Sequence, residues 1–479
     1  MGRMLPGRHG TARLIAALAS IVAAVGACQL AVGQASATPA GHGVIKHAKK
    51  PPTDWPAYLN GPEHTSYSPG QKAITTADAP SLVSKWHFDH GTQYYASPTI
   101  ANGSVYIGSN TGWFYQLNER TGKVRHKRFI GYQATTTCSP ALGVVSTATY
   151  ATDPANKRPT VYVAGPDGYL YALRASNLAL EWKAVVGIPS STVNDYFNYS
   201  SPTVSDRRVF VGISSNCDTP LVRGGVLAFS QTTGRKLAHL YTVPRGQVGG
   251  SVWSSVAVAP GGDLYVSTGN GPESEQLLDL SESILKLSPR TLKVLGKFQI
   301  PVSQVDFDAD FGASPVIIGR QYVGACDKNG IFYLLNQATM TVHWERQVGV
   351  GSGAYLECIA APAYNGHDLF LGTPSFTIDG TQYEGAVQER NASTGNLVWA
   401  TGLPNGVTGS PSLDGAGVLA VGTFDSTGIA NQTYLINSHT GAILSTLVEG
   451  YDFAQSVFAN GWLFTANDNG VYAWAPPKQ

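Results

Sequence analysis

Short runs of alternating apolar and polar residues fill the chain from about residue 55 onward, and glycine, asparagine, aspartate or proline bounds each run. Alternation over about four to eight residues is typical of a half-buried β-strand, and two such runs joined by turn residues predict a hairpin. The pattern therefore predicts an all-β protein built from short antiparallel strands.

One unit of this pattern recurs along the chain. It contains a small-residue pair such as Ser-Pro, an apolar stretch, a strand like VYVG, a turn, a strand like LYAL, an Asx-Gly or Thr-Gly turn, and a last strand that often carries tryptophan. We count eight copies, which begin with ASPTIANG, CSPALGVV, SSPTVSDR, WSSVAVAP, ASPVIIGR, AAPAYNGH, GSPSLDGA and AQSVFANG. A single four-stranded sheet cannot bury both faces, so the copies predict an eight-bladed β-propeller of four-stranded antiparallel blades. A sandwich of unrelated strands would not explain the regular Ser-Pro and Thr-Gly marks.

The eighth copy stops at VYAWAP, one strand short of the others. We expect the segment SLVSKWHFD, residues 81–89, to supply the missing outer strand. An N-terminal strand would then close the ring by pairing the first part of the domain with the last.

The N-terminus predicts export. Arg3, Arg8 and Arg13 lead into the apolar segment LIAALASIVAAVGACQLAVG, and ASA at 35–37 has the small-x-small pattern that signal peptidase accepts. We expect an export signal peptide at 1–37, a flexible tether at 38–54 and one propeller domain at 55–479. The favoured interpretation is free secretion, while the loose lipobox VGAC leaves open a lipoprotein of the cell-envelope exterior, anchored through Cys28.

Charge and cysteine content narrow the partners and the chemistry. Only 13% of residues are charged, the net charge is +1 and no basic stripe follows residue 50, which argues against a nucleic-acid or anionic-membrane partner. No later apolar run is long enough to span a bilayer, so we expect no transmembrane segment after signal removal. Four cysteines beyond the signal permit two disulfides, and none stands in a CxxC motif. Repeat positions suggest the pairs Cys138–Cys217 and Cys326–Cys358.

Polar residues of the fourth and fifth copies are predicted to meet near the propeller axis. The segment entering each innermost strand and the loop after the second strand lie on the same face of a propeller. These segments carry Trp253, Asn270, Lys328 and the triplet Asp306, Asp308 and Asp310. Carboxylates and an amide oxygen suit calcium or a larger trivalent cation, and a lysine beside such a cation calls for an anionic group between them. The set predicts a pocket for a planar, acidic, metal-bound ring system, with Lys328 polarising a carbonyl oxygen.

Structural explanations compete with this one. Aspartate and asparagine beside glycine are common turn residues, as in TGNG and DKNG, and a lone tryptophan is usually core. The aspartate triplet is harder to explain structurally, because three carboxylates within five residues repel one another unless a cation or protons relieve them.

The repeats resemble the pyrroloquinoline quinone (PQQ) repeat. The opening DWPAYLNGPEHTSYSP and the span from Trp55 to Trp474 are similar to eight-bladed quinoprotein alcohol dehydrogenases, particularly the polyvinyl-alcohol dehydrogenase-like branch. This resemblance implies PQQ and a calcium or lanthanide ion as cofactors. It also implies a primary or secondary alcohol, polymeric alcohols included, as substrate.

The resemblance assigns roles to residues of three motifs. VWSSVAVAPGGDLYVSTGN is similar to the family segment that implies Trp253 as the quinone floor and Asn270 as a ligand of the cofactor metal. DADFGASP implies Asp308 as general base and metal ligand, with Asp310 as the further ligand of lanthanide-using members. DKNGIFYLLN implies Lys328 as the contact to the quinone carbonyls and a stabiliser of developing charge.

The chain also departs from the family. The family's metal-binding Glu aligns with Thr219, which makes the adjacent Asp218 the substitute candidate, and the vicinal cysteine pair is missing. Because no CxxCH motif attaches a haem, electrons would pass to a separate acceptor. Loss of these features is also what a non-catalytic binding or assembly scaffold would show, so that function remains the alternative. A hydrolytic propeller lacks an evident nucleophile and base.

Overall fold

The computed structural model describes residues 53–133, 142–190, 195–217, 220–271, 279–305, 308–351, 357–424, 432–447, 450 and 453–478. The chain divides into Met1–Lys50 and Pro51–Gln479, and all described residues belong to the second unit. Across these ranges no helix is both long and apolar enough to cross a membrane. The sequence candidates Cys28, Cys138, Asp218 and Asp306 lie outside the described residues.

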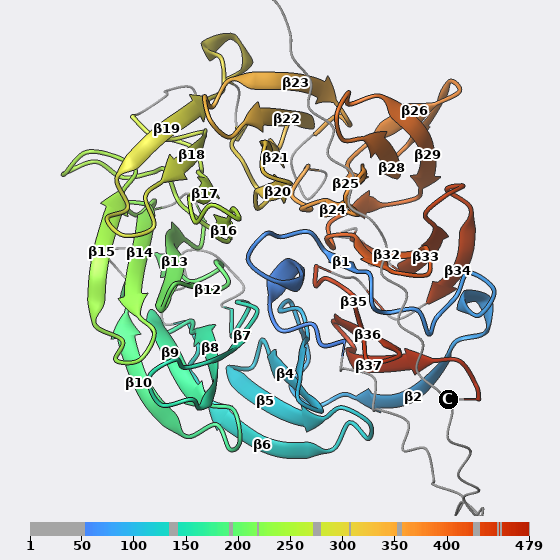
Figure 1. Ribbon diagram of the computed structural model, residues 1–479, viewed down its shortest axis with the longest axis horizontal. Helices are drawn as coiled ribbons and strands as arrows, with labels where there is room; N and C mark the ends of the chain where they lie inside the picture. Colours follow the sequence, from blue (N-terminus) through green and yellow to red (C-terminus); the bar gives the residue numbers. More distant parts are fainter. Residues whose placement is uncertain are drawn as a thin grey trace, which may run out of the picture. The chain divides into compact units, whose positions relative to one another are not determined.

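Eight antiparallel sheets, here called blades 1 to 8, follow one another around a ring (Figure 1), which confirms the predicted propeller. In blades 1 to 7 the strands run outward from the centre in chain order, and in blade 8 the outermost strand is the N-terminal β2. Blades 1 to 4 consist of β3 (Thr99–Ala101), β4 (Ser104–Gly108), β5 (Trp113–Asn118), β6 (Val124–Phe129); β7 (Thr149–Thr152), β8 (Pro159–Ala164), β9 (Tyr169–Arg174), β10 (Leu180–Val185); β12 (Thr203–Ser205), β13 (Arg208–Ser215), β14 (Gly225–Ser230), β15 (Lys236–Tyr241); and β16 (Ala257–Val258), β17 (Leu264–Ser267), β18 (Ser283–Leu287), β19 (Val294–Gln299).

Blades 5 to 8 consist of β20 (Val316–Ile318), β21 (Tyr322–Cys326), β22 (Ile331–Asn336), β23 (Val342–Gln347); β24 (Ala363–Tyr364), β25 (Asp368–Thr373), β28 (Gly385–Asn391), β29 (Leu397–Leu403); β31 (Ser412–Asp414), β32 (Val418–Phe424), β33 (Thr433–Asn437), β34 (Ile443–Leu447); and β35 (Val457–Ala459), β36 (Trp462–Asn467), β37 (Gly470–Ala475), β2 (Val83–Phe88). Short additions are β1 (Tyr67–Ser68), β11 (Tyr196–Phe197), β26 (Phe376–Ile378), β27 (Thr381–Tyr383), β30 (Gly406–Val407) and three 3-10 turns, Tyr58–Asn60, Ala79–Ser81 and Val302–Gln304.

The recurring serine before each inner strand links neighbouring blades. In successive blades the backbone N–H of one such residue donates to the side-chain hydroxyl of the next: Ser97 to Thr147, Thr147 to Ser201, Ser201 to Ser255 and Ser255 to Ser314, at 2.9–3.0 Å. Gln455 N–H donates to Ser97 Oγ at 2.9 Å and so joins the last blade to the first. The serine of the Ser-Pro motif thus takes part in a series of hydrogen bonds that connects neighbouring blades around the axis.

One repeat boundary differs from the prediction. In blade 2 the inner strand begins at Thr149, so the serine-like position is Thr147 in STATY, and not Ser139 of CSPALGVV. The prediction was wrong because a Ser-Pro pair, Ser139-Pro140, occurs upstream of the position that is equivalent to the serine of the other blades. That position carries Thr147-Ala148 in blade 2.

Tryptophans of the outer strands pack on the glycines of Thr-Gly turns. Trp399 lies over Gly441, where an added Cβ would stand 2.7 Å from its ring, and Trp86 lies over Gly122 in the same way. Each indole N–H also donates to a backbone carbonyl of the turn, for example Trp86 Nε1 to Glu119 O at 2.9 Å. Both glycines have positive φ, which a side chain would strain. The repeat therefore carries both a tryptophan and a Thr-Gly turn because the tryptophan of one blade packs on the Thr-Gly turn of the next blade.

The hydrophobic core lies between the blades. One cluster joins Tyr265 and Ile284 of blade 4 to Val323 and Tyr333 of blade 5. A blade buries its two faces only against its neighbours, which is why repeats of this kind fold as a closed ring.

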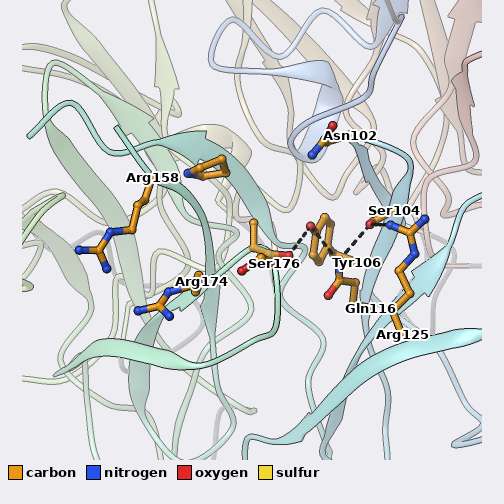
Figure 2. Close-up of a pocket in the computed structure, with 10 residues that line it drawn as sticks. Asn102, Ser104, Tyr106, Gln116, Arg125, Arg158, Arg174 and Ser176 are labelled. Carbon is orange, nitrogen blue, oxygen red and sulfur yellow. Dashed lines mark hydrogen bonds between the residues drawn. The ribbon is translucent and has the colours of Figure 1, made fainter. Parts of the chain in front are cut away.

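A polar cavity of about 620 Å³ opens between blades 1 and 2. Figure 2 shows Arg158 and Arg174 on one side, Arg125 on the other, and Tyr106 with Gln116 between them. Arg158 and Arg174 both pair with Glu181, at 3.6 and 3.7 Å.

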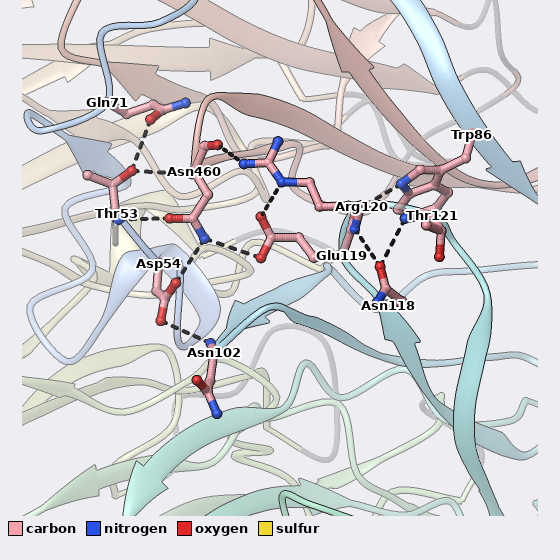
Figure 3. A network of polar contacts seen from close by, with 10 residues as sticks. All are labelled: Thr53, Asp54, Gln71, Trp86, Asn102, Asn118, Glu119, Arg120, Thr121 and Asn460. Carbon is pink, nitrogen blue, oxygen red and sulfur yellow. Dashed lines mark hydrogen bonds and ion pairs between the residues drawn. The ribbon is translucent and has the colours of Figure 1, made fainter. Parts of the chain in front are cut away.

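Ring closure follows the prediction. Strand β2 pairs antiparallel with β37, from Val83 opposite Ala475 to Phe88 opposite Val471. Figure 3 shows how polar contacts reinforce this closure around Asn460, in the hairpin between β35 and β36. Its side chain accepts from Thr53 N–H at 2.8 Å and donates to Asp54 Oδ1 at 2.9 Å.

Candidate functional site

Lys328 lies in the tight turn between β21 and β22, and the turn itself explains its neighbour Asp327. Asp327 is fully buried, and its Oδ1 accepts the Ile331 N–H at 2.8 Å. Burial raises the pKa of Asp327 to about 7. Gly330 has φ +87°, and a Cβ there would meet Gly349 O at 2.3 Å. Asp327 therefore builds the turn, as the structural explanation held, and Lys328 is the residue that the turn presents.

Lys328 bridges two carboxylates. Its Nζ lies 2.5 Å from Asp308 Oδ1 and 2.7 Å from Asp310 Oδ1. Its backbone is fixed as well, because Lys328 N–H donates to Asp310 O at 2.9 Å and Lys328 O accepts from Cys358 N–H at 3.3 Å. Burial alone would lower the pKa of Lys328, but Asp310, Asp308 and Glu357 together raise it above its ordinary value. The ammonium is thus held charged at the centre of an acidic cluster.

The two aspartates occupy different environments although they are two positions apart. Asp308 has φ +60°, a strained conformation for a residue with a side chain, and 24% of its side chain is exposed. The side chain of Asp310 is only 2% exposed, and its Oδ2 accepts the Trp253 Nε1–H at 3.3 Å. Burial raises the pKa of Asp310 against the lowering effect of Lys328. Asp308 can meet an incoming molecule, whereas Asp310 forms part of the wall.

Trp253 forms a second wall of the cluster. Its half-buried ring faces Lys328, whose Nζ is 5.3 Å from the ring centroid. A Cβ at Gly312 would come within 2.9 Å of the indole, so the glycine in DADFGASP gives the ring its space. Tyr199 packs edge-on against the indole, with ring centroids 6.4 Å apart.

Asn270 lies in the same region, as the backbone contacts of Asn270 and of the adjacent Gly269 show. Its carbonyl accepts the Gly250 N–H at 2.7 Å, and the residue is buried. The adjacent Gly269 lies against the cluster, since a Cβ there would stand 3.1 Å from Asp310 Oδ2. Trp253, Asn270, Asp308, Asp310 and Lys328 are therefore brought to one sector between blades 4 and 5, whereas the place of Asp218 lies outside the described residues.

Glu282 belongs to this region, and the sequence analysis missed it. It precedes β18, is fully buried, and donates its backbone N–H to Gly269 O at 3.0 Å. Burial first, and then the negative charges of Asp310 and Asp308, raise the pKa of Glu282 to about 7, while the Gly271 amide lowers it. In the sequence it is one glutamate before an ordinary strand, SILKL, and no local signal separates it from a surface residue.

The disulfide predicted between Cys326 and Cys358 is present, with a Cα–Cα distance of 5.8 Å. It joins blade 5 to the segment entering blade 6, directly beside Lys328. Cys217 is also disulfide-bonded, and its predicted partner, Cys138, lies outside the described residues.

Comparisons with known proteins support the repeat assignment. The PQQ_2 family model, described as "Outer membrane protein assembly factor BamB", matches residues 70–278 and 144–352, which together span more than half of the chain. A polyvinylalcohol dehydrogenase from Pseudomonas sp is 24% identical over 63% of this chain and 52% of its own length. The dehydrogenase subunit of a quinone alcohol dehydrogenase from Gluconacetobacter polyoxogenes is 25% identical over 62% and 46%. The chain thus spans about half the length of these curated relatives.

Solved structures share the fold. The quinohemoprotein alcohol dehydrogenase of Comamonas testosteroni superposes with a TM-score of 0.70 at 16% identity, covering 88% of this chain and 80% of that one. BamB from Moraxella catarrhalis gives 0.55 at 14% identity, covering 82% and 99%. The chain therefore belongs to the PQQ_2 repeat family, as an eight-bladed propeller that resembles quinoprotein alcohol dehydrogenases.

Proposed function

We propose that this chain is an exported alcohol dehydrogenase that uses PQQ with a calcium or lanthanide ion and passes electrons to a separate acceptor. The observation that carries the proposal is the buried lysine that bridges Asp308 and Asp310 beside the face of Trp253. Blade packing does not require an ammonium and two carboxylates at this place. A planar anionic cofactor does require a flat apolar wall and a fixed positive charge.

The residues present fit such a cofactor in their chemistry. Trp253 offers a ring face, Lys328 offers a charged donor, and Asn270 with the carboxylates offers oxygen ligands for a hard cation. The carboxyl groups of Glu282 and Asp310, both buried in this sector, are further oxygen atoms close to the cluster. Asp218 stays a predicted ligand from blade 3.

Each side chain then has a definite task. PQQ, when bound beside a metal ion, supplies the acceptor for the two electrons that leave the alcohol. Asp308, the partly exposed carboxylate, accepts the proton of the substrate hydroxyl once its contact with Lys328 is released or shared. Lys328, fixed at both backbone ends, supplies positive charge where negative charge develops. Asp310 positions two side chains at once, because its Oδ1 pairs with Lys328 Nζ and its Oδ2 accepts the Trp253 Nε1–H.

The substrate is proposed to be a primary or secondary alcohol, and a polymeric one is included. Two of the relatives are named as dehydrogenases of polyvinyl alcohol and of alcohols, which supports this substrate class. The exposed fraction of Asp308 leaves the base open to a molecule arriving from solvent.

The test is dye reduction by the purified exported protein. It is incubated with PQQ and either CaCl₂ or a lanthanide chloride, and a panel of primary, secondary and polymeric alcohols is added. We expect reduction that Asp308→Asn lowers by at least about a hundredfold, the usual contribution of a general base. Asp263→Asn is the matched control, because it breaks a comparable Asp–Lys pair, Asp263–Lys286 at 3.0 Å, elsewhere in blade 4. No reduction, together with no thermal shift on adding PQQ and metal, would refute the proposal.

The competing function is a non-catalytic assembly or binding scaffold. The description of the matching family model and the fold shared with BamB favour it. A scaffold would tolerate Lys328→Met and Asp308→Asn without loss of its partner interactions, and it would bind no PQQ. The same two measurements therefore separate the functions.

A further inference from the structure

The interface between blades 1 and 2 departs from the packing rule of the repeat. In blade 2, for example, Trp182 of the outer strand lies over Gly234 in the turn of blade 3, where an added Cβ would stand 2.5 Å from the ring. In blade 1 the exposed His126 holds the tryptophan position, across from Gln116 of β5. Leu178 stands where the turn glycine would be. The polar cavity of about 620 Å³ opens at this interface and is lined by Gln116.

Three arginines that line the cavity keep a surplus of positive charge. Arg158 and Arg174 share one carboxylate, Glu181, whose Oε1 lies 3.6 and 3.7 Å from their nearest nitrogens. These distances are longer than a hydrogen bond. The charge of Glu119 reaches the third arginine, Arg125, but the arginine that follows Glu119 in the chain is its closer partner, at 4.0 Å. Two shared carboxylates therefore leave the three guanidinium groups able to bind an anion.

Gln116 adds a buried acceptor between the arginines (Figure 2). The residue is only 4% exposed, and its Nε2 donates to Ser104 Oγ at 3.0 Å and to the Tyr106 hydroxyl at 3.3 Å. Its Oε1 is buried and accepts no hydrogen bond from the described residues. The Tyr106 hydroxyl donates to Ala175 O at 2.8 Å, so its proton is already used. A buried acceptor of this kind calls for a donor, which a ligand hydroxyl would supply.

The cavity lies on the face of the propeller opposite to Lys328. Lys328 follows the end of a second strand, β21, whereas Ser104 begins the second strand of its blade and Arg174 ends a third strand. The two ends of these strands lie on opposite faces of the ring. A ligand bound here would not touch the candidate dehydrogenase site, and its binding does not depend on the proposed function. The volume of about 620 Å³ suits a small molecule, for which sites of about 300–1,000 Å³ are typical.

We propose that this cavity binds an acidic saccharide. Its carboxylate, sulfate or phosphate group lies among Arg125, Arg158 and Arg174, and one of its hydroxyls donates to Gln116 Oε1. Guanidinium groups match the geometry of oxyanions with two parallel hydrogen bonds. Sulfate alone has no donor for Gln116, and a neutral sugar leaves the arginines without an anion. Free sugar acids and units of an anionic polysaccharide share this chemistry, and the side chains of Arg158 and Arg174, 52% and 41% exposed, are open to both.

The test is isothermal titration calorimetry of the full chain at low ionic strength. The probes are galacturonate, glucose 6-phosphate, galactose and sulfate, and trigalacturonate represents the polymer. We expect saturable binding of an acidic sugar, no binding of galactose, and weaker binding of sulfate. Tighter binding of trigalacturonate than of galacturonate identifies a polysaccharide unit as the ligand, and equal affinity identifies the free acid.

Two variants separate the two halves of the site. Arg174→Gln should weaken binding of the acidic sugar and of sulfate about 10-fold, because it removes a charge-assisted hydrogen bond. Gln116→Leu should weaken only the acidic sugar, about 5- to 10-fold, because sulfate does not use Oε1. Arg235→Gln is the matched control, since Arg235 is an exposed arginine beside a turn of blade 3, and it should bind like the wild type.

A variant that keeps Gln116 covers the case in which Gln116→Leu does not fold. The double variant Arg125→Gln/Arg158→Gln changes two partly exposed side chains and should abolish binding of the acidic sugar. The proposal is overturned if the wild type binds neither galacturonate, trigalacturonate nor glucose 6-phosphate, or if these variants bind them as the wild type does. Sulfate that binds as tightly as the acidic sugars also overturns it, because the cavity would then recognise charge alone.

Discussion

Replacing Lys328 by methionine should destabilise the metal-free protein, and the structure sets the size of the loss. Methionine keeps the volume of the aliphatic stem but removes the charge that bridges Asp308 and Asp310 at 2.5 and 2.7 Å. Removing one partner of a buried ion pair costs about 3–5 kcal/mol. The side chain of Asp308 is 24% exposed, so water screens part of its charge, and we expect a loss of about 2–4 kcal/mol at pH 8.

The loss should shrink in acid. The pKa of Asp310 is already raised from 3.8 to about 7 by burial, and removing Lys328 raises it further. For a group whose pKa is raised by folding, the associated stability is present below the unfolded pKa and is lost as pH rises through the folded pKa. Asp310 in the variant is therefore protonated at pH 5, and less than about half of the pH 8 loss should remain.

The assay is equilibrium unfolding in guanidinium chloride with EDTA, at pH 5 and pH 8. Lys286→Met is the control, since Lys286 pairs with Asp263 at 3.0 Å where Asp263 is partly exposed, and it should cost under about 1 kcal/mol. Calcium should restore part of the stability of Lys328→Met, because the cation replaces the lost charge. A variant as stable as wild type at pH 8, or one that loses more at pH 5, would show that the bridge does not hold the cluster.

Three further predictions concern the ring. Asn460→Ala removes the hydrogen bonds to Thr53 and Asp54 and should lower the unfolding free energy by about 2–4 kcal/mol; an unchanged denaturation midpoint would contradict its role in closure. Gly441→Ala should cost about 1–3 kcal/mol more than Gly319→Ala in the same assay, because both have positive φ but only Gly441 meets a tryptophan ring, and equal losses would refute the packing argument. Cys358→Ser opens a disulfide that spans 32 positions and should cost about 3–4 kcal/mol without reductant, a difference that reductant should erase; a persistent difference would mean that packing, not the cross-link, is responsible.

Much of the candidate site was predictable because its members stand at equivalent points of a repeat. Trp253 enters an inner strand, and Asn270 and Lys328 follow second strands, so the propeller alone brings them to one face. The difference between Asp308 and Asp310 was not predictable, because burial and φ depend on the packing of blade 5 against blade 4. The turn role of Asp327 was one of the two explanations that the DKNG motif offered, and the structure decided between them.

The sequence by itself determined the blades, their number and the closing strand. The reason is that alternation, turn residues and the Ser-Pro and Thr-Gly marks act over a few residues and repeat. Only the tertiary structure decided that Lys328 bridges two carboxylates and that Glu282 lies buried within reach of their charges. Those facts depend on desolvation and charge contributed by segments distant in sequence, and no local pattern encodes what a side chain will face once the ring has closed.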